Sequence, residues 1–114
     1  MPPRANPKAL NKLQLKTLAL LQAVARETDM AEADGDGVRI RSLPQPHGDH
    51  FHLGDAVVRA ADATGLRNPA VWHALDRKGL VEAEFPTRLR LTADGLGYDT
   101  GSAGSILHRA DHSA

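Results

Sequence analysis

Cysteine is absent from this chain of 114 residues, and aromatic residues make up only 4% of it. Without cysteine there is no disulfide, no zinc site built from thiolates and no thiol nucleophile. Leucine, valine and alanine must therefore fill most of the core. The absence of disulfides is compatible with a reducing compartment.

Long hydrophobic runs are also missing. No stretch approaches the roughly 20 apolar residues that a membrane-spanning helix needs. The N-terminal sequence MPPRANPKALNK lacks the apolar segment of a signal peptide. We therefore expect a cytoplasmic protein with no membrane partner. The length fits a single domain with one core.

An excess of either charge is missing too, because basic and acidic residues balance at 14 each. A net charge of zero counts against strong nonspecific binding of nucleic acid, whose affinity comes from neutralising phosphates. The charges are unevenly spread along the chain, however. Residues 27–36 are rich in acids, whereas residues 67–90 carry more basic than acidic side chains.

The stretch that organises the chain is residues 53–81, which read as helix, turn, helix and the start of a strand. Its first part has apolar residues at the spacing of one helical face, namely Leu53, Ala56, Val57, Ala60 and Ala61. Gly65 interrupts this pattern, as a glycine does in a left-handed helix cap. The pattern predicts a helix that ends close to Gly65.

A second helix has clear signals at both ends. Asn68 fits its N-cap, and Pro69 fits its first position. Arg77 and Lys78 suit the negative end of the helix dipole, and Gly79 ends the helix. Two short helices joined by a glycine-containing turn predict a helix-turn-helix.

An earlier helix is predicted over roughly residues 8–28, where apolar residues recur at helical spacing between Leu10 and Val24. Leu15 and Leu18 widen its apolar stripe. The wide stripe suggests a homodimer through this helix. Alternatively, both leucines cover a sheet within the same chain.

Alternating apolar and polar residues predict short strands at residues 38–43, 50–53, 80–85 and 88–92. The last two would form a β-hairpin directly after the second helix of the motif, in the position of a wing. The acidic stretch 30–37 and the glycine-rich stretch 93–105 show no period, so we expect loops there.

In this order, the predicted elements resemble the winged helix-turn-helix of regulators of the multiple-antibiotic-resistance type. In that family the recognition helix ends in a leucine-x-x-lysine-glycine-leucine phrase. The second wing strand reads leucine-threonine-x-x-glycine. The matching positions here are Leu75, Lys78, Gly79 and Leu80, then Leu91, Thr92 and Gly95.

The resemblance implies an α+β fold, in which a three-helix core carries a small antiparallel β-hairpin wing. We place this winged-helix domain at residues 9–98. Residues 1–8 are expected to form a disordered arm, and residues 99–114 a flexible tail. The family also implies double-stranded DNA as the partner and a role in regulating transcription.

The outward face of the second helix would then enter the major groove. Helical spacing and position assign to that face and its start Arg67, Asn68, Ala70, His73, Ala74 and Arg77. Arg77 can reach a guanine or a phosphate, and the alanines allow a close approach. An ordinary solvated face has a similar composition, so that reading stays open.

The wing and the inner side of the second helix complete this hypothesis. Arg88 and Arg90 share one face of the last strand, where they would contact backbone phosphates or simply face solvent. Val71, Trp72 and Leu75 are expected to point into the core.

Three histidines form an unusual cluster at His47, His50 and His52. Histidines two apart on a strand project to the same side, so both can bind one metal ion. Zinc is therefore a possible ligand, although no cofactor is otherwise expected. The competing interpretation is a set of exposed imidazoles that hydrogen-bond to the loop.

The leading hypothesis is a DNA-binding winged helix, and two alternatives remain beside it. One is a winged helix that binds protein and has no affinity for DNA. The other is a metal-binding protein built on the histidine cluster. No nucleophile with a neighbouring base stands out, so we do not expect an enzyme.

Overall fold

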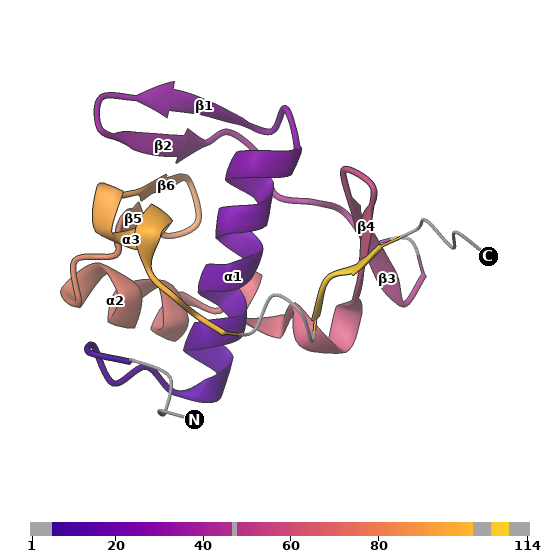
Figure 1. Cartoon of the computed structure of the whole chain (residues 1–114), viewed down its shortest axis with the longest axis horizontal. Helices are drawn as coiled ribbons and strands as arrows, with labels where there is room; N and C mark the ends of the chain where they lie inside the picture. The colour runs from indigo at the N-terminus through magenta and orange to yellow at the C-terminus, as the bar shows by residue number, and fades with distance from the viewer. Residues whose placement is uncertain (1–5, 47, 102–105, 110–114) are drawn as a thin grey trace.

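The computed structural model of the protein describes residues 6–46, 48–101 and 106–109. Its longest element, α1 (Lys12–Glu27), runs through the middle of the molecule, with both sheets and the other helices around it (Figure 1). A capping box begins the helix, because Asn11 and Gln14 each accept a hydrogen bond from the other's backbone N–H. The helix predicted over residues 8–28 is therefore confirmed, with a later start.

The middle of α1 is buried on every side, over residues 17–24. Leu18, Leu20 and Leu21 have no exposed surface, and Leu15 is partly buried against the same core. A helix that is covered all round forms the centre of a core. The leucine stripe that suggested a homodimer is thus packed within one chain, and the homodimer itself stays a prediction.

A four-stranded antiparallel sheet lies along one side of α1, with the strand order β1-β2-β6-β5. Its strands are β1 (Ala31–Asp34), β2 (Gly37–Ile40), β5 (Val81–Glu84) and β6 (Arg88–Leu91). The strands predicted at the positions of β2, β5 and β6 are confirmed. The loop expected at residues 30–37 is wrong, because β1 and β2 form a hairpin there with a two-residue turn at Gly35 and Asp36. Gly35 adopts φ 63°, which such a tight turn requires.

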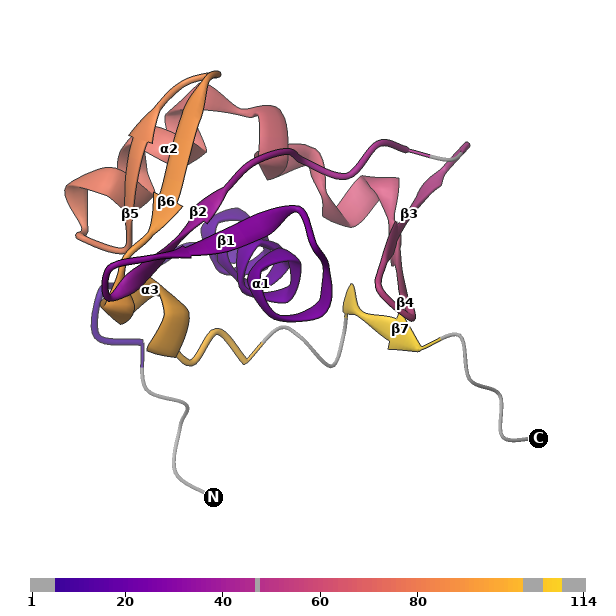
Figure 2. The same ribbon diagram turned by 90° about the horizontal axis from the view of Figure 1, so that it is seen from above.

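A second, three-stranded sheet lies on the other side of α1 from the β5–β6 hairpin (Figures 1 and 2). It consists of β3 (His50–Leu53), β4 (Ala56–Arg59) and β7 (His108–Arg109) in the order β3-β4-β7. β3 confirms the predicted strand at residues 50–53, with Phe51 and Leu53 only 8% and 1% exposed.

The helix predicted from Leu53 onward is wrong. A turn at Gly54, with φ 60°, leads into β4, and two short 3₁₀ turns follow, η1 (Ala60–Asp62) and η2 (Thr64–Arg67). Apolar residues here fit both a helical and a strand period. Pairing decides between them, because β4 satisfies its backbone groups against β3 and buries Ala56 and Val58.

Gly65 has a different role from the one expected. It lies in η2, is buried and faces Thr17 of α1, so that an added Cβ would lie 1.9 Å from the Thr17 hydroxyl oxygen. The residue is needed for a close approach between η2 and α1, and not for a left-handed cap.

Helix α2 (Pro69–Arg77) confirms the second predicted helix. A further helix, α3 (Ala93–Gly97), replaces part of the loop expected at residues 93–105. The Thr92 side chain caps α3 by accepting a hydrogen bond from the Gly95 backbone at 3.0 Å. The buried Gln22 amide of α1 holds this region, since it donates to the carbonyls of Gly95 and Tyr98, each at 2.8 Å.

Residues near both chain ends make contacts with the rest of the fold where they are described. The Lys8 backbone donates to the Tyr98 hydroxyl at 3.0 Å, and that hydroxyl donates to Asn6. Ile106 is 1% exposed, and β7 pairs with β4. The predicted arm and tail therefore do not include these residues, while positions 1–5, 102–105 and 110–114 lie outside the described residues. Within the described parts, no helix has the length and hydrophobicity to cross a bilayer.

Replacing Gly65 with alanine tests the contact between η2 and α1. The new methyl group would overlap Thr17, which is fully buried and donates to the Leu13 carbonyl at 2.8 Å. We expect Gly65→Ala to lower the free energy of unfolding by about 1–3 kcal/mol in urea denaturation. Combining it with Thr17→Ala should cost less than the sum of the two single changes.

Gly97→Ala is the matched control, because nothing lies within 4 Å of a Cβ at that position. It should change stability by less than about 1 kcal/mol. Equal effects at positions 65 and 97 would contradict the proposed packing role of Gly65.

Candidate nucleic-acid interface

Helix α2 begins and ends as its sequence predicts. The Asn68 side chain accepts from the Ala70 backbone at 2.9 Å, and Pro69 occupies the first helical position. At the other end Gly79 adopts φ 77°, and the backbones of Gly79 and Leu80 donate back into the last turn at 2.9 and 3.0 Å. This is the Schellman arrangement, which fixes where the helix stops.

The inner side of α2 is held by Trp72, as expected. Val71, Trp72 and Leu75 are 5%, 3% and 0% exposed. The Trp72 indole N–H donates to the Leu66 carbonyl at 2.9 Å, which ties the helix to η2. The Trp72 and Phe85 rings pack edge-to-face, with their centroids 4.8 Å apart. This contact holds the tip of the β5–β6 hairpin against α2.

The outward face of α2 is narrower than predicted. Ala70, His73 and Arg77 are exposed, but Ala74 is only 5% exposed and is not available to a partner. One turn further along, the Lys78 ammonium donates to the carbonyls of Lys8 and Ala9 at 2.8 and 3.2 Å. The N-terminal segment therefore lies against this side of the helix, which the spacing of residues within α2 does not reveal.

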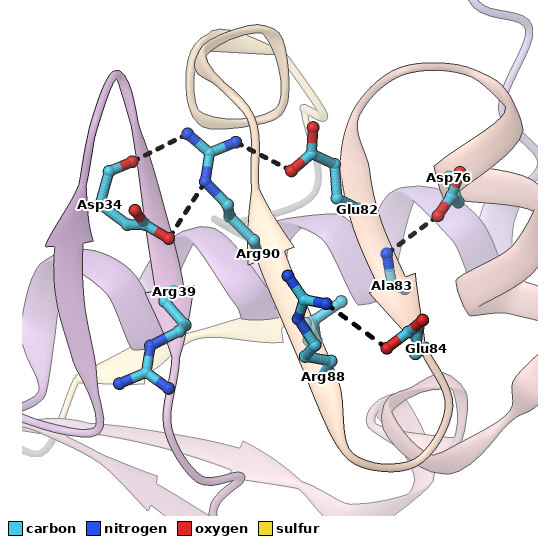
Figure 3. A pocket seen from close by; sticks show the side chains of 9 residues that line it. Asp34, Arg39, Asp76, Glu82, Ala83, Glu84, Arg88 and Arg90 are labelled. Carbon is cyan, nitrogen blue, oxygen red and sulfur yellow. Dashed lines mark hydrogen bonds and ion pairs between the residues drawn. The ribbon is translucent and has the colours of Figure 1, made fainter.

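Arg90, which the sequence suggested as a phosphate contact, is surrounded by three carboxylates in the structure. Its guanidinium forms ion pairs with Asp34, Asp36 and Glu82 at 3.3, 2.9 and 3.2 Å, of which Figure 3 draws those to Asp34 and Glu82. The hydrogen bond to Asp36, reinforced by the nearby charges of Glu82 and Asp34, raises the pKa of Arg90 above its ordinary value. These ion pairs hold the Arg90 guanidinium on the outer face of the sheet.

The whole solvent-facing side of the four-stranded sheet is a pattern of paired charges. In register across the strands lie Glu32, Arg39, Arg90 and Glu82, and Arg88 faces Glu84 in the next row. A hollow of about 230 Å³ between this face and α2 is lined by four acids and three arginines (Figure 3). The acid Asp76 of α2 also accepts the Ala83 backbone N–H of the edge strand at 2.9 Å. The acids that line this hollow thus outnumber its arginines by one.

Next to this hollow, around the tip of the wing, the lining residues have a different composition, although Arg88 and Leu89 line both regions. Two hollows of about 140 and 230 Å³ lie around the hairpin tip and share the lining residues Ile40, Arg41, Thr87, Arg88 and Leu89. Their arginines, which we name the wing-tip arginine cluster, are Arg39, Arg41, Arg67 and Arg88. None of the described residues that line these two hollows is acidic.

The members of the wing-tip arginine cluster differ in how firmly they are held. Arg39 pairs with Glu32, and Arg41 donates to the Asp29 carbonyl. Arg88 lies 3.5 Å from Glu84, but both side chains are more than 70% exposed, at 75% and 72%. Exposed pairs of this kind contribute little and exchange readily with other partners. Arg67 is exposed directly before the Asn68 cap.

Arg39 and Arg41 were missing from the predicted site. Their alternation with Val38 and Ile40 indicates an exposed strand face, and that signal is present in the sequence. Arg88 lies near them because β2 pairs directly with β6, and Arg67 joins them from η2, outside the sheet.

The histidine cluster lies elsewhere, on the β3–β4 hairpin at the far side of α1. The Nε2 atoms of His50 and His52 are 3.2 Å apart, which confirms that both project to one side. His47 lies outside the described residues. Within the described residues, no group of three or more His, Cys, Asp or Glu side chains is arranged to hold a metal.

No protein-family model matches the sequence, and no match was found among curated proteins or among solved structures. The function must therefore be argued from the arrangement of these side chains.

Replacing Arg90 tests its assignment to the sheet. Arg90→Gln leaves Asp34, Asp36 and Glu82 without their shared cation, so we expect a lower midpoint of urea denaturation at low salt. Added salt should narrow the difference from the wild-type protein, because it screens the exposed repulsion between the carboxylates. Arg88→Gln is the control and should hardly change the midpoint. An unchanged midpoint for Arg90→Gln at low salt would show that the network does not stabilise the fold.

Proposed function

We propose that the protein binds double-stranded DNA as a winged-helix regulator of transcription. The single observation that carries this proposal is the wing-tip arginine cluster. Arg41, Arg67 and Arg88 of this cluster line two hollows beside the start of α2. No acidic side chain among the described residues lines either hollow. A group of arginines at the edge of an exposed helix is suited to the DNA backbone.

The position of the cluster supports this function. Arg67 lies just before α2. Thr87 lies at the tip of the wing, and Arg88 is the first residue of the wing's second strand, β6. The Trp72–Phe85 contact keeps the tip close to α2, so both elements face a partner together. A duplex that meets the wing tip with its phosphates would bring its major groove to the exposed side of α2.

The exposed side of α2 has the residues that reading a groove requires. Ala70 allows the helix to approach the bases, and His73 and Arg77 supply hydrogen-bond donors further along. Arg90 and Ala74 are no longer part of the proposed contact. The revised set is Arg41, Arg67, Asn68, Ala70, His73, Arg77 and Arg88.

A winged helix-turn-helix normally has a helix before the recognition helix, and this chain has η1 and η2 in that place. Both turns precede α2, and η2 packs closely on α1 through Gly65. Short 3₁₀ turns of this kind are common as connectors between longer elements. This support for the winged-helix assignment comes from element order and packing.

A protein partner is the second candidate, and the outer face of the sheet together with the exposed Phe85 beside α2 favours it. The outer face of the four-stranded sheet is rich in acids. Phe85 is 41% exposed and lines a hollow together with Ala83 and Pro69. A basic segment of another protein would complement that face. The same protein then needs no affinity for DNA.

Titrating a fluorescent duplex of random sequence with the protein tests DNA binding. We expect an anisotropy increase at low salt whose affinity falls steeply as salt rises, because phosphate contacts release counterions. The double variant Arg67→Ala/Arg88→Ala should weaken binding to every sequence alike. It should also reduce the salt slope by about two, one for each lost phosphate contact.

Arg59→Ala is the matched control, since Arg59 is exposed on β4, away from the wing. It should leave affinity and salt slope unchanged. Failure to bind any duplex at low salt would reject the DNA proposal and leave the acidic sheet face as the surface to investigate.

Arg77 is expected to act differently from the wing-tip arginines. If it reaches a base, Arg77→Ala should cost about 1–3 kcal/mol on the preferred site and relax the choice of base there. The loss of base preference can be measured by selecting binding sites from a random DNA library with the wild-type protein and the variant in parallel. An identical preferred sequence for both proteins would assign Arg77 to solvent or to the backbone.

A further inference from the structure

The outer side of the β3–β4 hairpin presents two imidazoles on a fixed support. Phe51 and Leu53 alternate with His50 and His52 and are buried, at 8% and 1% exposure. The strand is paired along its whole length with β4. Neither histidine can turn inward without exposing this apolar pair, so both remain on the solvent side.

The two rings converge on one another at their outer nitrogens. The Nε2 atoms are 3.2 Å apart, whereas the ring centroids are 4.9 Å apart with an interplanar angle of 79°. The closest approach is therefore between the two atoms with which histidine most readily binds a metal.

We propose that His50 and His52 form a binding site for a divalent transition-metal ion. Two imidazole nitrogens bound at ~2.0–2.1 Å to one tetrahedral zinc ion are separated by about 3.3 Å. The observed 3.2 Å is close to that value, so a metal can be accepted with little movement. Imidazole ligands favour Cu²⁺, Ni²⁺ and Zn²⁺ over Mg²⁺ or Ca²⁺, and Cu²⁺ should bind most tightly.

The surroundings of the pair fit this role. The Asp49 carboxylate lies 3.4 Å from Nδ1 of His50, on the side of the ring opposite Nε2. A carboxylate in that position favours a proton on Nδ1, which makes the Nε2 atom that faces His52 the metal-binding nitrogen. The His50 side chain is 36% exposed, so an ion can enter from solvent.

Within the described residues the pair supplies two ligands, so water, an external ligand or another part of the chain would complete the coordination of the ion. The hairpin that carries the pair also touches α1, since a Cβ at Gly54 would lie 2.6 Å from the Glu27 carbonyl oxygen. Metal bound to the hairpin would therefore stabilise a segment that packs on the central helix.

Calorimetric titration of the full-length, metal-free protein with zinc chloride at neutral pH tests the proposal. We expect one ion per chain, with a dissociation constant below about 100 µM. His50→Gln and His52→Gln should each weaken binding at least about tenfold, because each removes one of the two proposed imidazole ligands. With Cu²⁺ in place of zinc, the nitrogen splitting in the electron paramagnetic resonance spectrum should indicate one imidazole fewer in each variant than in the wild-type protein.

His73→Gln is the matched control, because His73 is exposed on α2 and lies outside the hairpin. It should bind zinc as the wild type does, and circular dichroism should show all variants folded. Two results would overturn the proposal: no saturable zinc binding by the wild-type protein, or undiminished binding after both His50 and His52 are replaced. Either would assign the 3.2 Å contact to a direct hydrogen bond between the imidazoles.

Discussion

Thr17 and Gly65 meet where η2 crosses the buried middle of α1, and this contact determines how the rest of the molecule is assembled. Because Gly65 has no side chain, η2 can lie directly on the helix. The indole of Trp72 then reaches the Leu66 carbonyl, and its ring reaches Phe85. A chain of contacts thus runs from the core through η2 and α2 to the tip of the wing. A larger residue at position 65 would displace all of them together.

Ion pairing on the four-stranded sheet leaves the acidic side chains and the exposed arginines in different regions of its surface. Arg90 lies on an inner strand within reach of three carboxylates from β5 and from the β1–β2 hairpin, so that end of the sheet is acidic. At the tip of the β5–β6 hairpin, Arg41, Arg67 and Arg88 line two neighbouring hollows that none of the described acids lines. A chain with no net charge can therefore present a basic surface, because what a phosphate meets is the local arrangement and not the total.

The proposed DNA contact and the proposed metal site lie on opposite sides of α1. The wing and α2 are on one side, and the β3–β4 hairpin is on the other (Figure 2). Both are joined to the same helix, the first through η2 and the second through the turn at Gly54. Each proposal rests on its own geometry, so either can fail without affecting the other.

The sequence by itself determined what depends on neighbouring residues. Asn68, Pro69 and Gly79 bounded α2, and strict alternation placed Leu89 and Leu91 inward on β6. Only the tertiary structure decided whether the residues after Leu53 form a helix or a hairpin, because their apolar spacing suits both and β3 supplies the pairing. It likewise decided that the charge of Arg90 is paired with acids, since Asp36, the closest of them, is 54 positions away in the chain. A local signal fixes a residue's own backbone, whereas the partner of a side chain depends on which distant strands the fold brings together.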